Sequence, residues 1–474
     1  MIGGLRGATS RYALAVAVGA VMAVALVQKP AQAADLGGDC CADLEERVAE
    51  LEATTVRKGN KKVSVQIYGK LNRFVAAWDD GAEKNVYVDN NSYSSSRVGI
   101  RGKAKIGGDW SAGYRMEWED ETALSKNTNQ FVPGDDPDFG AINVRHSYWY
   151  IDNKNVGQLR VGLTSTAKDD ITKDTHVAGE IIDTMHSDFY LNQDFRLRPR
   201  GFNTESDLSA LDWADITRCY STSSAVFDCS TRRNNVAFWS KKVLGMTEDG
   251  GFWGSWAWGE DDIWSLALRY EDEWGKNFKV GGGIAYESFA DERVNAGGGG
   301  LAGFARDLKE LAGSASIMHV PTGLFVFGAF STSEDDDTGA FGVFTGQRAP
   351  DMESWDVSIG IQKEWWALGE TTLWGGYTES NDAIGGFTRG NGTWDGFIPA
   401  GELANVAVDT QITGADVNKW YLAADQHIES AAMSLYIAYQ HIEGDLDLVD
   451  SALAPVAAPI DDFDVIFSGA RIYF

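Results

Sequence analysis

From Lys62 to Phe474 the chain repeats segments of about ten residues in which apolar and polar positions alternate. In SRVGIRGKAKI, residues 96–106, the basic side chains occupy odd positions and the apolar ones occupy even positions. WSAGYRMEWE, residues 110–119, and AINVRHSYWYI, residues 141–151, follow the same rule. Successive side chains of a β-strand point to opposite faces, so this period of two predicts strands with one apolar and one polar face.

The connections between these segments alternate in length. Short ones, such as residues 107–109, 153–156 and 275–277, alternate with long polar stretches rich in Gly and Asp. The longest stretch covers residues 167–234, and counting between connections gives about sixteen strands, with one hairpin near residues 240–265 hard to place. Short turns at one end, long loops at the other and an even strand number predict an all-β fold, a transmembrane antiparallel β-barrel.

The placement of aromatic residues distinguishes this barrel from a soluble β-sandwich, whose strands also alternate between apolar and polar residues. Membrane barrels carry girdles of aromatic side chains where the strands meet the two membrane surfaces. Candidates for such girdles, all near predicted strand ends, are Trp78, Trp110, Trp118, Tyr148, Tyr150, Trp365, Trp366 and Trp420.

Residues 1–33 are predicted to be a signal peptide for export. Arg6 and Arg11 precede an apolar run of about 16 residues, which is shorter than the ~20 that a spanning helix needs. Small residues at Ala31 and Ala33 suit cleavage after Ala33. No later run approaches ~18 apolar residues, so any membrane span has to be built from strands.

Residues 34–61 hold the strongest helical pattern and are expected to form a periplasmic segment. Leu44, Val48 and Leu51 recur at spacings of four and three, as in a coiled-coil seam. About two heptads are too short to be stable alone. Two interpretations stay open: an amphipathic tether lying on the barrel, and a short coiled coil that helps three subunits to assemble in register.

Charge narrows the class of partner. The chain of 474 residues has a formal net charge of −28, and removal of the signal peptide takes away three basic residues and no acid, which leaves −31. Such a charge keeps the surface hydrated and argues against a nucleic-acid partner.

The four cysteines fall into two pairs. Cys219 and Cys229 lie within the longest loop, where an oxidising compartment favours a disulfide between them. Cys40 and Cys41 are adjacent, which is a poor geometry for bonding to each other. They either bridge between chains or stay reduced.

The C-terminal sequence FSGARIYF places Gly469, Ile472 and Phe474 at the spacing of an outer-membrane assembly signal. With DLEERVAELEATTVRKGNKKVSVQIYGKLN, residues 43–72, which follows the export signal and the paired cysteines, the chain resembles the general-diffusion porins of alphaproteobacteria. The cysteine pair in the third loop is similar too. The resemblance implies a sixteen-stranded trimeric barrel in the outer membrane of a Gram-negative bacterium, with the third loop folded into the lumen. It also implies passive diffusion of small hydrophilic solutes, contact with lipopolysaccharide, and recognition of the C-terminal strand by the barrel-assembly machinery.

Strand parity then predicts a basic wall in the pore. A charge facing mid-membrane lipid costs roughly 2–4 kcal/mol, so basic residues on these strands are expected to point into the lumen. The alternative is that they pair with Glu117 or Glu119 and only balance charge. The predicted wall consists of Arg97, Arg101, Lys103, Lys105, Arg115, Arg145 and Arg160.

The loop at residues 167–234 is rich in acids, and the resemblance places it opposite the basic wall. Opposed charges across a narrow gap create a transverse field that admits polar solutes and disfavours apolar ones. The candidate acids of this constriction are Asp169, Asp170, Asp174, Glu180, Asp183 and Asp188. The basic wall favours anions, whereas the negative total charge favours cations at the mouths, and we lean toward cations.

Three other classes of function stay open. A barrel-embedded hydrolase needs a Ser–His pair, but His146 is expected to point toward lipid and no Gly-x-Ser-x-Gly motif occurs. A substrate-specific channel is the nearer alternative, selective for sugars or anions; sugar-specific porins use a row of lumen aromatics, and residues of lumen parity such as Trp149 and Tyr421 form no obvious row. A purely structural or adhesive barrel would have a plugged lumen and no conductance. We expect no enzyme activity, no cofactor and no metal.

Overall fold

The structure is a computed structural model of the 474-residue chain. It describes residues 62–131, 142–173, 194–202, 211–217, 232–259, 263–293, 305–335, 350–384, 397–398, 400–401, 403 and 406–474. The predicted signal peptide and the predicted helical segment at residues 34–61 both lie outside this part of the chain.

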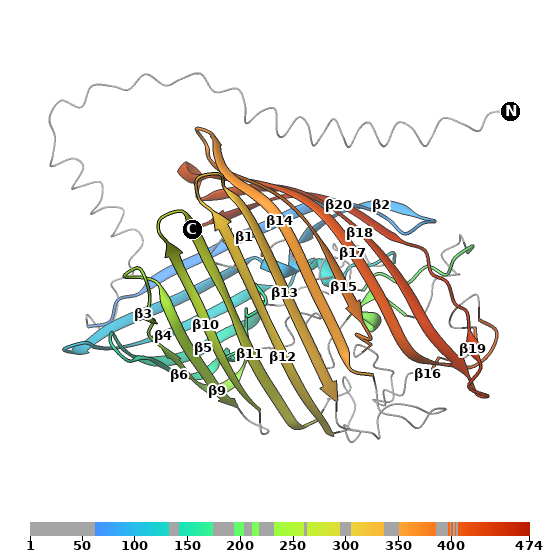
Figure 1. The fold of residues 1–474 in the computed structure, drawn as a ribbon, viewed down its shortest axis with the longest axis horizontal. Coiled ribbons are helices and arrows are strands. Elements are labelled where there is room, and N and C mark those ends of the chain that lie inside the picture. Colours follow the sequence, from blue (N-terminus) through green and yellow to red (C-terminus); the bar gives the residue numbers. More distant parts are fainter. Residues whose placement is uncertain are drawn as a thin grey trace. The chain divides into compact units, whose positions relative to one another are not determined.

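Sixteen long antiparallel strands of the described chain form one closed barrel, which confirms the predicted fold class (Figure 1). The ring closes where β1 pairs with β20 over ten residue pairs, from Lys70 with Tyr473 to Asp79 with Asp464. The strands are β1 (Gln66–Asp79), β3 (Arg97–Gly107), β4 (Trp110–Asp120), β5 (Ile142–Asn153), β6 (Gly157–Ser165), β7 (Arg232–Ser240), β9 (Gly251–Gly259), β10 (Trp264–Trp274), β11 (Phe278–Arg293), β12 (Ala305–His319), β13 (Leu324–Asp335), β14 (Met352–Trp366), β15 (Gly369–Asn381), β17 (Thr410–Ile428), β18 (Met433–Asp450) and β20 (Phe463–Tyr473).

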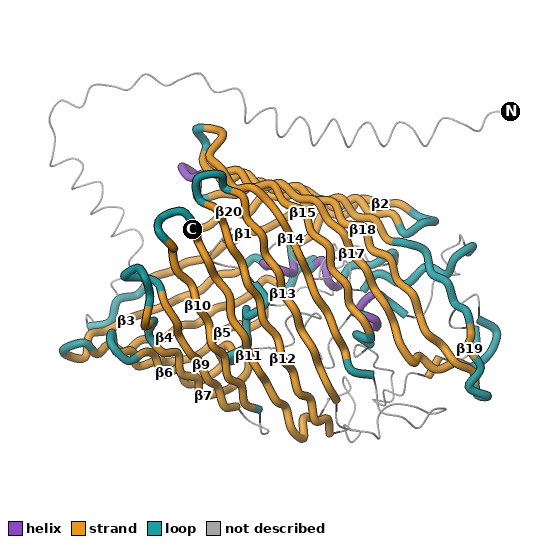
Figure 2. Tube along the Cα trace, in the orientation of Figure 1, coloured by secondary structure: helices purple, strands orange, loops and turns teal. Residues whose placement is uncertain are grey.

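Four shorter strands, β2 (Lys84–Asn90), β8 (Val243–Leu244), β16 (Phe397–Ile398) and β19 (Pro455–Val456), extend the loops. The hairpin that the sequence left uncertain is formed by β7 and β9, which pair directly. The short 3-10 helices η1 (Ser92–Ser94), η2 (Ser125–Asn127), η6 (Trp213–Ile216) and η7 (Glu429–Ala431) occur in connections (Figure 2). No helix among the described residues is long and apolar enough to span a membrane.

The alternation of the sequence becomes an inverted distribution of polarity across the barrel wall. On β14 the polar Ser354, Asp356 and Ser358 are at most 3% exposed, whereas Val357 and Ile359 on the other face are 50% and 61% exposed. A water-soluble fold buries apolar side chains and exposes polar ones. The outer surface of this barrel therefore suits an apolar surrounding, and its inner face suits polar groups.

A β-bulge in β5 overturns the predicted orientations on this strand. The register against β4 shifts so that Glu117 pairs with His146 and Trp118 pairs with Val144, which leaves one residue, Arg145, unpaired. An extra residue reverses the parity of everything after it. The prediction that His146 points toward lipid is therefore wrong: its side chain lies on the inner face and is 6% exposed.

The same bulge changes the aromatic assignments. Trp149, predicted to face the lumen, is 49% exposed on the outer face, whereas Tyr148 and Tyr150 lie on the inner face beside Arg115 and Gly113. Trp78 is also not a girdle residue, since it is 4% exposed and packs against Tyr87 and Phe195. Girdle candidates that are clearly exposed are Trp110, Trp365, Trp366 and Trp420.

Candidate functional site

Glu117 is the centre of a charge cluster on the inner face of β3, β4 and β5. Its carboxylate is fully buried and lies 2.6 Å from Arg115 Nη2, 3.2 Å from Arg145 Nε and 3.6 Å from Arg97 Nη1. Arg145 also reaches Glu119 at 2.9 Å, and Tyr68 Oη donates a hydrogen bond to Glu117. Three members of the predicted basic wall, Arg97, Arg115 and Arg145, are thus brought together. They pair with Glu117 and Glu119, the two acids that the sequence analysis named as possible counter-ions.

The wall continues along β3 with basic side chains whose charges are less fully neutralised by carboxylates than those of the Glu117 cluster. Arg101 donates a hydrogen bond from Nε to the amide oxygen of Gln66, and its guanidinium stacks 5.1 Å from the centre of the Tyr68 ring. Lys103 lies 3.8 Å from Asp152 and its side chain is 59% exposed, and Lys105 is exposed as well. These cations are solvated, which distinguishes them from the Glu117 cluster.

Arg160 on β6 marks the other edge of the wall. Its guanidinium lies 4.9 Å from the Trp239 ring centre and 5.6 Å from that of Tyr148, and its Nε donates to Gln158. Cation–π contacts hold the guanidinium flat against the wall without neutralising it. Contacts on the inner face of β3 to β6 thus involve six of the seven predicted wall residues, and the seventh, Lys105, is exposed near the end of β3.

The chain leaving β6 packs against β10, β11 and β12, which begin three strands further around the barrel. Ser265 Oγ accepts a hydrogen bond from the Ala167 amide, and Arg269 Nη2 donates to the carbonyls of Ala167 and Asp169. Lys168 and Glu310, both fully buried, form an ion pair of 2.8 Å. We call residues 166–173 the loop base.

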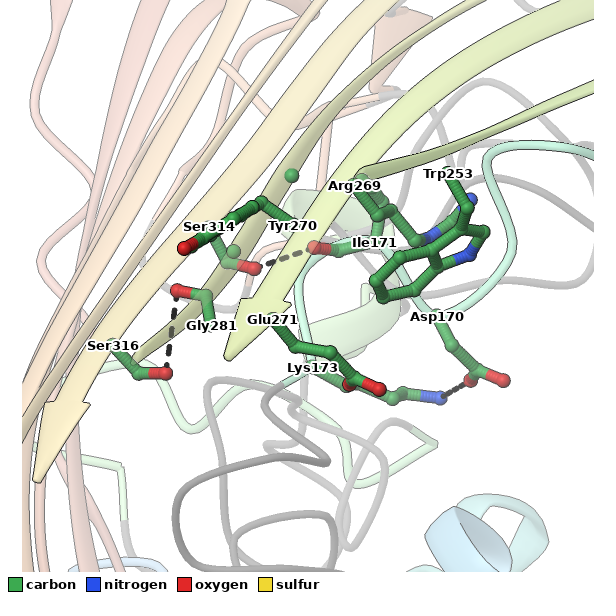
Figure 3. Close-up of a pocket in the computed structure, with 12 residues that line it drawn as sticks. Asp170, Ile171, Lys173, Trp253, Arg269, Tyr270, Glu271, Gly281, Ser314 and Ser316 are labelled. Atoms are coloured by element: carbon green, nitrogen blue, oxygen red, sulfur yellow. Dashed lines mark hydrogen bonds and ion pairs between the residues drawn. The ribbon is translucent and has the colours of Figure 1, made fainter. Parts of the chain in front are cut away.

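Figure 3 shows the far end of the loop base beside a pocket at the barrel wall. Ser314 Oγ donates to the Ile171 carbonyl at 2.6 Å, and Ile171 is 2% exposed. A Cβ at Gly283 would lie 2.8 Å from Cδ1 of Ile171, so the Ile171 side chain approaches the sheet closely at this glycine. The loop base is therefore packed against the sheet, whereas the inward fold of the whole third loop stays a prediction.

Two predicted constriction acids lie on the loop base. Asp169 is 4% exposed and its carboxylate lies 3.8 Å from Arg232, at the start of β7. Asp170 has a positive φ of 62° and lies 2.9 Å from Lys173. Desolvation would raise the pKa of Asp170, but the Lys173 ammonium and the guanidinium groups of Arg232 and Arg269 hold it well below its usual range.

The remaining predicted constriction residues, Asp174, Glu180, Asp183 and Asp188, lie outside the described residues, as do Cys219 and Cys229. The next described parts of the loop, residues 194–202 and 211–217, pack at the long-loop end of the barrel. Arg198 and Asp80 form an ion pair of 2.8 Å there, with both side chains at most 2% exposed, and Trp213 is buried beside Phe463.

Sequence reasoning missed several residues of this site. Lys168, Glu310 and Arg269 hold the loop base, but they lie on segments distant in sequence and follow no motif. Arg232 was missed because it falls inside the stretch that was assigned to the loop. The one signal that pointed to Arg232 was a basic residue at the start of a segment with alternating polarity.

We expect the charge of Asp170 to persist on mild acidification. Because its pKa is lowered, the carboxylate is lost only as the pH falls well below the ordinary value of about 4. Asn tolerates the positive φ, so Asp170→Asn should change the reversal potential in a salt gradient by the same amount at about pH 7 and about pH 3, where an ordinary carboxylate is mostly protonated. A difference from the wild type that disappears at about pH 3 would contradict this.

A closed strand wall with an apolar exterior, a polar interior and an inserted loop base defines a β-barrel channel of the outer membrane. The family model described as Gram-negative porin matches residues 13–447, and the chain belongs to this family. It therefore forms an outer-membrane channel for the passive diffusion of small hydrophilic solutes.

Comparison with curated proteins gave no match. Among solved structures, the chain is similar to OmpT of Vibrio cholerae, an outer membrane protein, with 15% identity, 88% of this chain and 99% of that chain covered, and a TM-score of 0.48. OmpF of Salmonella typhi in complex with daunomycin has 11% identity, with 89% of this chain and 100% of that chain covered, and a TM-score of 0.44. The outer membrane channel DcaP of Acinetobacter baumannii has 11% identity, with 88% of this chain and 99% of that chain covered, and a TM-score of 0.44.

Proposed function

We propose that this porin is a general-diffusion channel whose narrow region lies between the basic wall and the loop base, and that this region prefers small anions. The observation that carries the proposal is the solvated run Arg101, Lys103 and Lys105 on the inner face. The described wall sets seven cations against three carboxylates, those of Glu117, Glu119 and Asp152. This differs from the cation preference expected from total charge, because the proposal rests on the charges of the described wall and not on the total.

General diffusion is favoured over specific uptake because the aromatic rings described on the inner face are occupied by cations of the wall: Arg101 lies over Tyr68, and Arg160 lies over Tyr148 and Trp239. Tyr421 has the expected inward orientation, but it is 1% exposed and bonded to Asp356. Trp149 faces outward. A solute sliding along the wall meets charged and amide groups, which exchange hydrogen bonds with water at little cost.

The proposal includes no catalytic role. A Ser–His contact exists between His427 Nδ1 and Ser434 Oγ, but it is long at 3.4 Å and Ser434 is 2% exposed. A nucleophile needs both a close base and access to substrate. We further propose a homotrimer with the N-terminal segment in the periplasm, lipopolysaccharide around its rim, and assembly through the C-terminal strand. Heat-sensitive migration of the purified oligomer on a gel tests the trimer.

Replacement of Arg101, Lys103 and Lys105 by Gln together should shift the permeability ratio toward cations by several-fold. The three ammonium and guanidinium charges are removed from a water-filled passage, where fixed charges set ion occupancy. Reversal potentials of single channels in a KCl gradient measure the ratio. The control replaces Lys154 and Lys276, which are exposed in short turns, by Gln. An unchanged ratio in the triple variant would refute the proposed anion preference.

A further inference from the structure

A group of metal-ligating side chains lies far from the basic wall, at the long-loop end of β18 and β20 (Figure 1). His441 on β18 is the cross-strand partner of Asp464 on β20. Glu443 and Asp462 take the next positions of the same parity on their segments. The His441 ring contacts the exposed ring of Trp420 at 5.6 Å, so the group lies on the outer face of the barrel.

The imidazole of His441 is held between two carboxylates. Nδ1 lies 2.8 Å from Asp464 Oδ1, and Nε2 lies 3.0 Å from Glu443 Oε1. One ligand atom each from His441, Glu443 and Asp462 lie within 4.8 Å of one another. Three carboxylates surround one imidazole, so a divalent cation here would meet an excess of negative charge.

The surroundings fix the histidine in the orientation that a metal needs. Asp464 also accepts a hydrogen bond from Tyr439 Oη, and the rings of Tyr439 and His441 both pack against Trp420. A carboxylate on one ring nitrogen fixes the proton there and directs the lone pair of the other nitrogen outward. Here that other nitrogen is Nε2, which lies 3.0 Å from Glu443 Oε1. All of these positions lie on or beside paired strands, which are more rigid than loops.

We propose that His441 Nε2, Glu443 and Asp462 bind a first-row divalent cation of the Zn²⁺ class at the outer rim of the barrel, with Asp464 as the positioning residue. One imidazole and two carboxylates supply three ligands and leave a fourth position for water. A site containing imidazole favours Zn²⁺ over Ca²⁺, which takes six to eight oxygens. Any proton on Nε2 leaves to solvent when the nitrogen–metal bond forms.

Small side-chain movements are enough to complete the geometry. Tetrahedral Zn²⁺ with bonds of about 2.0–2.1 Å needs ligand atoms about 3.3 Å apart. The Glu443 side chain is 57% exposed and extends into solvent, so it is able to rotate toward the cation. His441, at 17% exposed, stays fixed by Asp464 and Trp420.

Titration of the full-length folded protein in detergent with ZnCl2, followed calorimetrically, tests the proposal. We expect one binding event per chain that His441→Asn weakens at least tenfold, while His319→Asn, at the last residue of β12, leaves it unchanged. Asp464→Asn keeps every ligand yet should weaken binding about 10–100-fold. Asp461→Asn, a neighbouring acid paired with Arg200, is its matched control and should bind normally.

Three results would overturn the proposal: no saturable Zn²⁺ binding, binding that His441→Asn leaves intact, and CaCl2 binding as tightly as ZnCl2. The last two would indicate ordinary attraction to acidic groups. Unchanged single-channel conductance of each variant confirms that the barrel is folded, so loss of Zn²⁺ binding is separable from loss of the channel.

Discussion

Glu117→Gln should lower the free energy of unfolding by about 3–5 kcal/mol and increase anion preference. The substitution keeps the shape of the side chain and removes one negative charge that lies within 4 Å of three guanidinium groups. Breaking a buried ion pair from one side leaves the partner charges in a site that was arranged around their counter-ion. Arg97, Arg115 and Arg145 would then repel one another.

Urea unfolding in detergent micelles measures the stability, and reversal potentials measure the preference. Glu364→Gln provides the control, because Glu364 is exposed near the turn between β14 and β15 and should change neither quantity. A second variant that combines Glu117→Gln with Arg115→Gln should recover part of the lost stability, because it removes one of the repelling charges. If Glu117→Gln is as stable as the wild type, the Glu117 cluster does not hold this wall together.

The strand pattern could be predicted because each lipid-facing position has to be apolar. This requirement produces an alternation of apolar and polar residues that is visible in the sequence. The count of sixteen strands and the inward side of Arg97, Arg101 and Arg115 follow from this alternation. It fails at one inserted residue. The bulge at Arg145 reverses the orientation of the rest of β5, and no local signal in AINVRHSYWYI distinguishes a bulge from a regular strand.

The candidate sites needed three-dimensional information for a different reason. Glu117 collects its arginines from three strands, and the loop base reaches Glu310 across 142 residues of sequence. The proposed cation site likewise joins β18 to the start of β20, so its residues have no metal-binding spacing along the chain. Which residues meet in the Glu117 cluster, at the loop base and in the proposed cation site depends on how the strands pair, and the sequence alone does not determine that pairing.

Lys168→Met should release the loop base and produce a larger, noisier single-channel conductance. Lys168 and Glu310 are both fully buried, and removal of one partner from such a pair costs about 3–5 kcal/mol. A change of about 3 kcal/mol increases the population of a detached loop roughly a hundredfold. Hydrogen bonds through Ser265, Arg269 and Ser314, each worth about 1 kcal/mol, also hold the loop base, but they do not replace the lost ion pair.

Lys173→Met serves as the matched control within the same loop. Its partner Asp170 has a side chain that is 54% exposed, and partly exposed pairs contribute at most about 1 kcal/mol. We therefore expect near-normal conductance and normal resistance of the loop to added protease. In the double variant Lys168→Met with Glu310→Gln, no buried carboxylate is left beside the lost ammonium, so the conductance should return toward that of the wild type. Equal behaviour of Lys168→Met and Lys173→Met would show instead that the hydrogen bonds, and not the buried ion pair, anchor the loop base.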